Sequence, residues 1–129
     1  MIKATHICIA SALTINLIMK NPISAIGLMG STLPDVDLLI GIPHRTFTHS
    51  LVFTSIVCFI ILLVNKEIGV IFGMSILSHL AADSTTKMGV PLFYPFNKKY
   101  YGFRRFKTGS SEDYIIGVLA VSYIAWVLR

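Results

Sequence analysis

The run Leu51–Val64, with the sequence LVFTSIVCFIILLV, decides the fold because it is long, apolar and free of charged side chains. The polar connection Asn65-Lys66-Glu67 follows it directly. Residues 68–86 then form another apolar run, which only Asp83 interrupts. Two apolar runs joined by so short a connection predict an antiparallel helical hairpin.

Further apolar runs lie on both sides of this hairpin. Residues 4–19, 21–34 and 114–128 contain no Asp, Glu, Lys or Arg, and Pro22 suits the first turn of a helix. We therefore expect helical segments at about residues 4–19, 22–33, 48–64, 68–84 and 113–128, with a loop over residues 86–109.

The composition points to a membrane. The 129-residue chain is 54% hydrophobic and only 13% charged, and its mean hydropathy is +0.74. Soluble domains carry roughly 25% charged residues, and a small domain leaves much of its surface in water. The composition excludes intrinsic disorder and disfavours an ordinary soluble globule. We predict one all-α domain over residues 1–129, an integral-membrane bundle of four to five short transmembrane helices.

The order of these segments separates the polar residues. Each apolar core is shorter than the ~20 residues that span a bilayer alone, so the polar ends should lie near an interface or inside the bundle. Alternating crossings place every histidine, and every acidic residue except Glu67, on one side. This group comprises His6, Asp35, Asp37, His44, His49, His79, Asp83, Glu112 and Asp113. The same side carries most Lys and Arg, which predicts a cytoplasmic face, although basic residues that bind a phosphate would give the same bias.

The pair His79 and Asp83 is the most specific local signal for a metal. Residues four apart share one face of a helix, so the pair offers a nitrogen and an oxygen to a single ion. A charged residue inside a membrane segment costs about 2.5–3.5 kcal/mol, which favours a functional role over a helix-terminal hydrogen bond. The mixed donors suit Zn²⁺, Mn²⁺ or Fe²⁺, and their number allows one or two ions, with Zn²⁺ the first candidate.

Three further candidate ligands each have a simpler alternative. His6 at the start of the first segment could be a hydrogen-bonded interior residue. Asp35 and Asp37 could form only a turn and a helix cap. Two acids at the edge of an apolar span are costly without a cation, however, and we expect at least one of them to bind metal.

The segment after these acids contains two histidines that differ in expected role. Thr48 could cap the following helix, which makes His49 the favoured ligand and leaves His44 as a candidate general acid or base. Arg45 lies between them, and its planar guanidinium suits a phosphate oxygen, but it could equally pair with an aspartate that binds no metal.

The loop over residues 86–109 mixes aromatic and basic side chains. Its basic cluster comprises Lys98, Lys99, Arg104, Arg105 and Lys107. Such a mixture can stack single-stranded nucleic acid, yet aromatic and basic residues also gather at membrane interfaces. The surrounding apolar segments favour the interface, so we expect membrane lipid and not nucleic acid as the partner. Gly89, Pro91 and Pro95 forbid a continuous helix, and we expect a lid or re-entrant flap over the site.

Six separated motifs, in order, resemble the YdjM-type family of membrane-bound metal-dependent hydrolases. They are Thr5-His6 with Ala10, Gly30-Ser31-x-Leu33-Pro34-Asp35-x-Asp37, His44-Arg45-x-x-Thr48-His49-Ser50, His79-Leu80-x-x-Asp83, Gly89-Val90-Pro91-Leu92 with Tyr94-Pro95-Phe96, and Thr108-Gly109-Ser110 with Glu112. The resemblance implies a helical hydrolase of the prokaryotic inner membrane with a divalent metal. It implies the ligands His6, Asp35, Asp37, His49, His79 and Asp83, and adds Glu112 as a catalytic acidic residue. The order of the donors is also distantly similar to zinc-dependent phospholipase C, which implies phosphoester bonds in lipids.

The expected function is hydrolysis of a phosphoester in a phospholipid or lipid-linked substrate by metal-activated water. His44 would move protons, and Arg45 with the loop cations would stabilise negative charge on the phosphate. The alternative is a membrane protein without catalytic activity that binds a structural or transported divalent metal.

Overall fold

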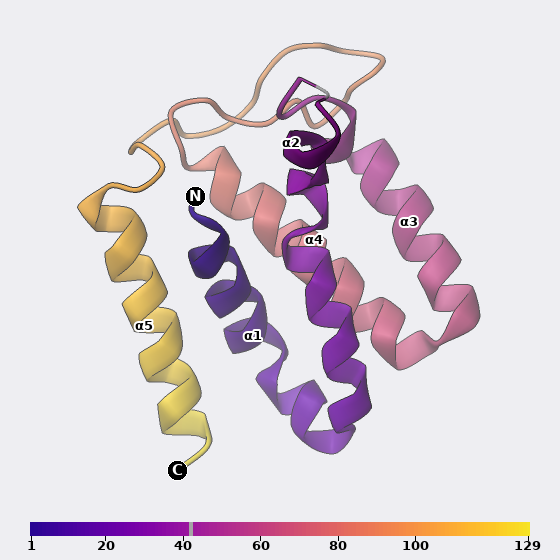
Figure 1. The fold of residues 1–129 in the computed structure, drawn as a ribbon, viewed down its shortest axis with the longest axis vertical. Helices are drawn as coiled ribbons and strands as arrows, with labels where there is room; N and C mark the ends of the chain where they lie inside the picture. The colour runs from indigo at the N-terminus through magenta and orange to yellow at the C-terminus, as the bar shows by residue number, and fades with distance from the viewer. Residues whose placement is uncertain (42) are drawn as a thin grey trace.

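The predicted hairpin is formed by α3 (Leu51–Val64) and α4 (Lys66–Ser84), which pack against each other in the computed structural model (Figure 1). Asn65 separates the two helices, and its side-chain oxygen accepts a hydrogen bond from the Ile68 N–H at 3.0 Å. This contact satisfies one of the N–H groups that a helix start leaves unpaired. The structure describes residues 1–41 and 43–129, and over these residues the predicted all-α class is confirmed.

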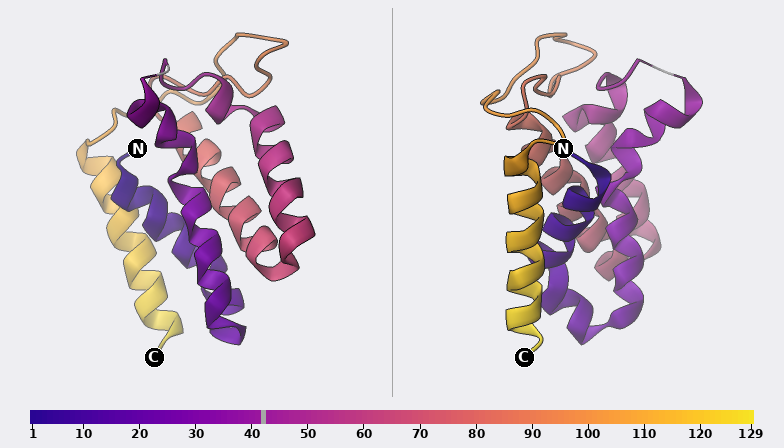
Figure 2. Two further views of the ribbon diagram at one scale, coloured as in Figure 1. Left: turned by 45° about the vertical axis from the view of Figure 1, so that its right-hand side comes forward. Right: turned by 60° about the vertical axis from the view of Figure 1, so that its left-hand side comes forward.

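Helix α4 is the central element of the bundle. It contacts α3, α1 (Lys3–Lys20) and the 3-10 helix η1 (Pro22–Ser31), while α5 (Ser111–Val127) packs against α1 on the outside (Figure 2). Phe72, Ile76 and Leu80 of α4 form the buried core together with Val90. The core therefore lies along one helix, and the other elements are arranged around it.

The second segment forms a 3-10 helix, η1, where the sequence predicts a regular helical segment. A 3-10 helix has three residues per turn, so side chains three apart eclipse each other. Ser24, Gly27 and Gly30 consequently form one line, and all three are buried. A Cβ atom on Gly30 would lie 2.5 Å from the Phe72 carbonyl oxygen, and one on Gly27 would lie 2.7 Å from that of Ile68. The missing side chains let η1 approach the α4 backbone closely.

Three short elements connect η1 to the hairpin. They are η2 (Leu33–Val36), α2 (Asp37–Ile40) and η3 (Phe47–His49). All three lie at the end of the bundle where the chain starts and where the long loop after α4 crosses (Figure 1).

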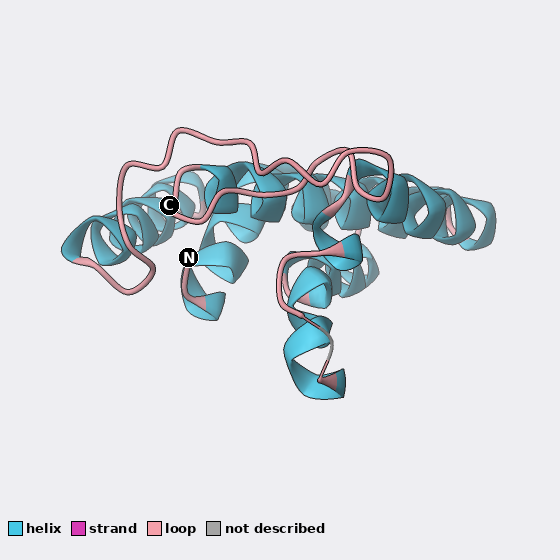
Figure 3. Cartoon of the chain, turned by 90° about the horizontal axis from the view of Figure 1, so that it is seen from above, coloured by secondary structure: helices cyan, strands magenta, loops and turns pink. Residues whose placement is uncertain are grey.

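The loop between α4 and α5 passes over this end of the bundle (Figure 3). Two isolated bridges organise it, one between Thr86 and Phe106 and one between Val90 and Tyr101. The Leu92 carbonyl accepts a hydrogen bond from the Leu51 N–H at 2.9 Å, which fastens the loop to the start of α3. The side chain of Phe96 remains 88% exposed.

Within the described residues, none of the helices taken singly has both the length and the apolar character needed to cross a bilayer. One pair meets these requirements together, Pro22–Ser31 with Leu33–Ile40, and it is bent by 52°. The helical part of the predicted architecture is thus confirmed, and the membrane-spanning part stays a prediction.

Candidate metal centre

Four donor atoms from three segments converge beneath the loop. They are Oδ1 of Asp35 from η2, Nε2 of His49 from η3, and Nε2 of His79 and Oδ2 of Asp83 from α4. The two imidazole nitrogens are 3.3 Å apart. Each of them lies 3.6–3.7 Å from the carboxylate oxygens of Asp35 and Asp83. We call these atoms the four-donor cluster.

The spacing of the four-donor cluster fits a divalent metal. A tetrahedral zinc ion binds nitrogen and oxygen donors at about 2.0–2.2 Å, which separates neighbouring donors by about 3.3–3.6 Å. The five separations that involve a histidine nitrogen are 3.3–3.7 Å, which is close to that range. The four side chains are buried, so their lone pairs and charges need a partner within the protein. The structure thus contains buried His and Asp groups that could hold a metal ion.

His6 supplies a further donor beside this cluster. Its ring stacks on His79 with the centroids 3.8 Å apart, and Nε2 lies 3.2 Å from Oδ1 of Asp83. Neither ring nitrogen makes a hydrogen bond within the described structure, although the side chain is only 1% exposed. A buried polar atom without a partner is costly, and a cation bound by one ring nitrogen would remove that cost for that nitrogen. His6, His79 and Asp83 accordingly form one group of possible ligands, and Asp35, His44 and His49 form another.

Groups behind the cluster orient the histidine rings. Nδ1 of His79 donates to the Ser31 carbonyl at 2.7 Å, because a carbonyl oxygen can only accept. Nε2 therefore keeps its lone pair, and it is this nitrogen that belongs to the four-donor cluster. Metal-binding histidines are commonly held in this way through their other ring nitrogen. The close packing of η1 on α4 is what brings the Ser31 carbonyl to His79.

Asp37 lies behind the cluster and uses both carboxylate oxygens for hydrogen bonds. Oδ1 accepts from Nδ1 of His44 at 2.8 Å, and Oδ2 accepts from the Arg45 N–H at 3.0 Å and the Thr48 hydroxyl at 2.9 Å. Oδ2 also lies 3.5 Å from Nδ1 of His49. Asp37 thus organises the segment that carries both histidines, and its role as a ligand stays a prediction.

Arg45 is buried and pairs with Asp83, whereas the alternative to phosphate binding expected from the sequence is an aspartate that binds no metal. Its guanidinium lies 2.9 Å from Oδ2 of Asp83 and donates to the Thr86 hydroxyl at 2.8 Å and the Gly89 carbonyl at 3.1 Å. The residue connects the cluster to the start of the long loop. The backbone of Arg45 has a φ of 58°, an unusual left-handed conformation for a residue with a side chain.

The two remaining predicted residues differ in position. His44 is half-buried, 28% exposed, and its Nε2 lies 4.0 Å from Oδ1 of Asp35 at the edge of the cluster. Glu112 is exposed in the first turn of α5, where its carboxylate accepts a hydrogen bond from Ser111 at 3.3 Å. The structure brings His44 to the donors and does not bring Glu112 into either group of possible ligands among the described residues. The catalytic roles of His44, Arg45 and Glu112 stay predictions.

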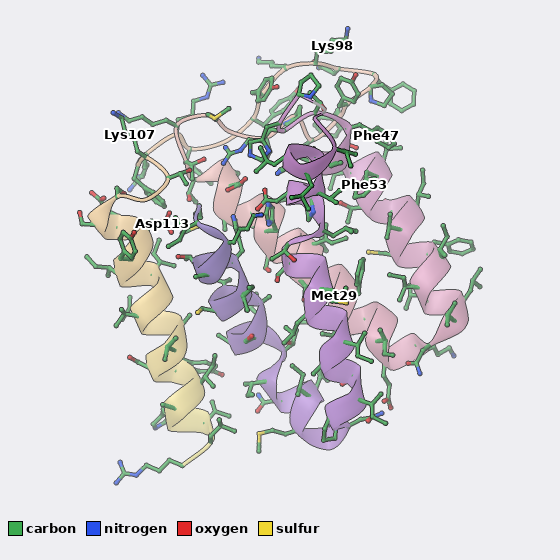
Figure 4. All side chains as sticks on the ribbon, viewed as in Figure 1. Met29, Phe47, Phe53, Lys98, Lys107 and Asp113 are labelled. Atoms are coloured by element: carbon green, nitrogen blue, oxygen red, sulfur yellow. The ribbon has the colours of Figure 1, made fainter. Side chains whose placement is uncertain are left out.

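Asp113 is a buried residue to which the sequence assigned no role. It lies at the top of α5 (Figure 4), and its Oδ2 accepts from the N–H groups of Ile2 at 2.9 Å and Gly109 at 2.8 Å. It therefore fastens α5 to the residue before α1, close to where the Met1 amino group contacts Asp83. Acidic residues are common in the first turn of a helix, so the sequence gives no signal that separates Asp113 from an ordinary helix-start residue. Its hydrogen bond to the distant Ile2 appears only in the structure.

Comparison with known proteins shows which family the chain matches. The YdjM inner membrane protein family matches residues 1–128. The chain is also similar to the "Uncharacterized protein YvsG" of Bacillus subtilis (strain 168), with 38% identity over 77 residues.

That similarity covers 57% of this chain and 47% of the relative, so it spans about half the relative's length. No solved structure matches significantly, and the comparisons do not show the predicted similarity to zinc-dependent phospholipase C. Because the family match covers nearly the whole chain, this protein belongs to the YdjM inner membrane protein family.

Proposed function

We propose that this protein is a metal-dependent hydrolase that cleaves a phosphoester of a phospholipid or another lipid-linked substrate. The four-donor cluster supports the proposal most strongly, because its two histidine nitrogens lie 3.3–3.7 Å from each other and from the carboxylate oxygens, a spacing that suits ligands of a divalent ion. His6 adds to this support, because its buried ring nitrogens make no hydrogen bond within the described residues.

The ligands in this proposal are Asp35, His49, His79 and Asp83, with His6 adjacent. A divalent ion, with Zn²⁺ the first candidate, supplies an activated water and polarises the phosphoryl oxygen when it is bound. Every other task falls to the protein's own side chains, which bind, orient and protonate the substrate.

His44 is the side chain best placed to move a proton. Its Nδ1–H is held by Asp37 at 2.8 Å, so Nε2 is the basic nitrogen and lies on the partly exposed side of the cluster. A positioned imidazole of this kind can take a proton from water or give one to a leaving group. Arg45 adds positive charge 2.9 Å from Asp83, where it would favour the developing charge on a phosphate.

The cytoplasmic orientation of the site is also a proposal. Basic side chains of the long loop, including Lys98 and Lys107 (Figure 4), extend at the same end of the molecule as the cluster. An excess of Lys and Arg marks the cytoplasmic side of inner membrane proteins.

A second candidate function is a structural or transported metal without catalysis. The observation in its favour is the burial of the cluster, since His49, His79 and Asp83 are at most 1% exposed. Structural metal sites have every position filled by protein, whereas catalytic sites keep one open for water. X-ray absorption of the zinc-loaded protein separates the two, because a water ligand supports catalysis and a closed protein shell supports the structural role.

The decisive experiment measures bound metal and hydrolysis together. Detergent-purified wild type, His79→Ala and Asp83→Ala are analysed for metal content and assayed against a panel of lipid phosphoesters. Lys20→Ala, at the opposite end of α1, is the control. We expect wild type and Lys20→Ala to bind metal and hydrolyse at least one lipid, and both site variants to lose at least 100-fold in activity. Full metal occupancy and unchanged turnover in both site variants would overturn the proposal.

A further inference from the structure

A groove runs along the outside of η1 and leads to the metal centre. It has a volume of about 420 Å³. Met29 of η1, Ile61 of α3 and Phe72 of α4 contribute to its apolar part. Phe72 belongs to the buried core, whereas Met29 is 68% exposed. The groove is thus bounded by packed helices on the inside and open on the outside.

Polar groups of the groove come from the part of the chain that builds the site. Asp35, Thr32 and Lys3 line it together with the apolar residues. Oδ1 of Asp35 belongs to the four-donor cluster, so the groove and the metal centre share a residue. A carboxylate, a hydroxyl and an ammonium group in an otherwise apolar groove match a ligand with a charged head and a hydrocarbon tail.

We propose that this groove binds one acyl chain of an anionic membrane phospholipid, with the phosphate between Lys3 and the metal centre. This inference rests on the proposed hydrolase function and specifies its substrate class. Lys3 offsets the negative charge of Asp35, which alone would repel a phosphate. Each methylene moved from water into an apolar groove contributes about 0.8 kcal/mol, so a long chain in the groove would favour lipids over soluble phosphoesters.

The binding test uses the full chain in vesicles of phosphatidylethanolamine and phosphatidylglycerol. A trace of phosphatidylglycerol carries a diazirine on one acyl chain, and crosslinked peptides are identified by mass spectrometry. We expect crosslinks on η1 and α4. In Met29→Trp the larger indole side chain should fill the groove and lower the crosslinking yield on these two elements at least tenfold. Leu119→Trp is the matched control, because Leu119 of α5 is similarly exposed, 63%, and does not line the groove. Equal yields in the two variants at equal melting temperature would overturn the inference.

A second measurement separates this inference from the proposed function. Long-chain and short-chain phosphoesters with the same head group are compared as kcat/KM ratios. We expect the long-to-short ratio to fall at least tenfold in Met29→Trp and to stay at the wild-type value in Leu119→Trp. If wild type hydrolyses neither substrate, the proposed function fails while the crosslinking result still decides whether the groove binds a chain. If Met29→Trp hydrolyses both substrates with the wild-type long-to-short kcat/KM ratio, the inference that the groove binds an acyl chain is overturned, and the proposed hydrolase function is unaffected.

Discussion

Asp37 shows how one carboxylate can organise a site without belonging to the donors that define it. Three groups donate to it within 3.0 Å, from His44, Arg45 and Thr48. None of the oxygen atoms of Asp37 belongs to the four-donor cluster, and its side-chain hydrogen bonds within the described residues all go to the segment that carries His44 and Thr48. We therefore predict that Asp37 orients the loop histidines, so that a change at Asp37 would alter metal affinity through His44 and His49.

Replacing Asp37 by Asn tests this assignment. We expect Asp37→Asn to weaken zinc binding by about 10–100-fold, the range typical of groups that orient metal-binding histidines. The stoichiometry at saturating zinc should not change. Isothermal titration calorimetry measures both quantities, with Thr46→Ser on the same loop as the control. A lower stoichiometry would instead place Asp37 among the ligands, as the sequence predicts.

The 3-10 helix η1 shows that backbone proximity can matter more than side-chain burial. Gly27 and Gly30 face the α4 backbone, and their lack of a Cβ atom sets the distance between the two elements. The same contact brings the Ser31 carbonyl within 2.7 Å of Nδ1 of His79. Packing of η1 on α4 and orientation of a candidate ligand are therefore coupled.

Gly30→Ala should separate the two elements and disturb the site. The new Cβ atom would lie 2.5 Å from the Phe72 carbonyl oxygen, so backbone must move. We expect a loss of about 1–3 kcal/mol in unfolding free energy, as for overpacking elsewhere, together with weaker zinc binding. Gly73→Ala in α4 is the matched control, because its Cβ would meet only the Cys58 sulfur at 3.3 Å. Equal denaturation midpoints for the two variants would refute the close packing.

The candidate metal centre joins segments that are distant in the chain, so a bound metal ion should stabilise the whole bundle. His6 is in α1, Asp35 in η2, His49 in η3, and His79 and Asp83 are in α4. A ligand that binds only the folded state stabilises it by about 2.7 kcal/mol at 100 times its Kd.

Zinc should accordingly raise the melting temperature, and a chelator should reverse the rise. In His6→Ala we expect a smaller rise, because one donor next to Asp83 is lost. Thermal unfolding in detergent at fixed protein concentration measures the effect, with Lys20→Gln as the control. A melting temperature that is independent of zinc in the wild type would contradict a metal centre between these elements.

Asp113 fastens α5 to the bundle at a similarly long range. Asp113→Leu keeps the approximate size of the side chain but removes the oxygen that accepts from the Ile2 and Gly109 N–H groups, and leaves both unpaired. We expect it to cost about 1–3 kcal/mol of unfolding free energy, the usual penalty for an unpaired buried group. Glu112→Gln, at the exposed neighbouring position, should leave the unfolding midpoint unchanged. Equal midpoints for the two variants would show that Asp113 does not hold α5.

Local patterns in the chain were sufficient to predict the helical class, the hairpin around Asn65 and a group of buried His and Asp residues that could hold metal. Apolar runs and i, i+4 spacing are properties of residues close together in the chain, so they can be recognised without knowing which helices pack against each other. The family resemblance is likewise confirmed by the match over residues 1–128. The spanning of a membrane, the reaction and the substrate stay predictions.

Other features depend on which distant segments meet. The close approach of η1 to α4 depends on packing between distant segments, and the pairing of Arg45 with Asp83 likewise joins residues that are distant in the chain. Asp113 finds its partner at Ile2, 111 positions away in the chain. Hydrogen bonds require donor and acceptor atoms about 3 Å apart, and ion pairs require charged atoms within about 4 Å of each other. Composition and periodicity carry no information on such distances, and only the packed arrangement of the helices sets them.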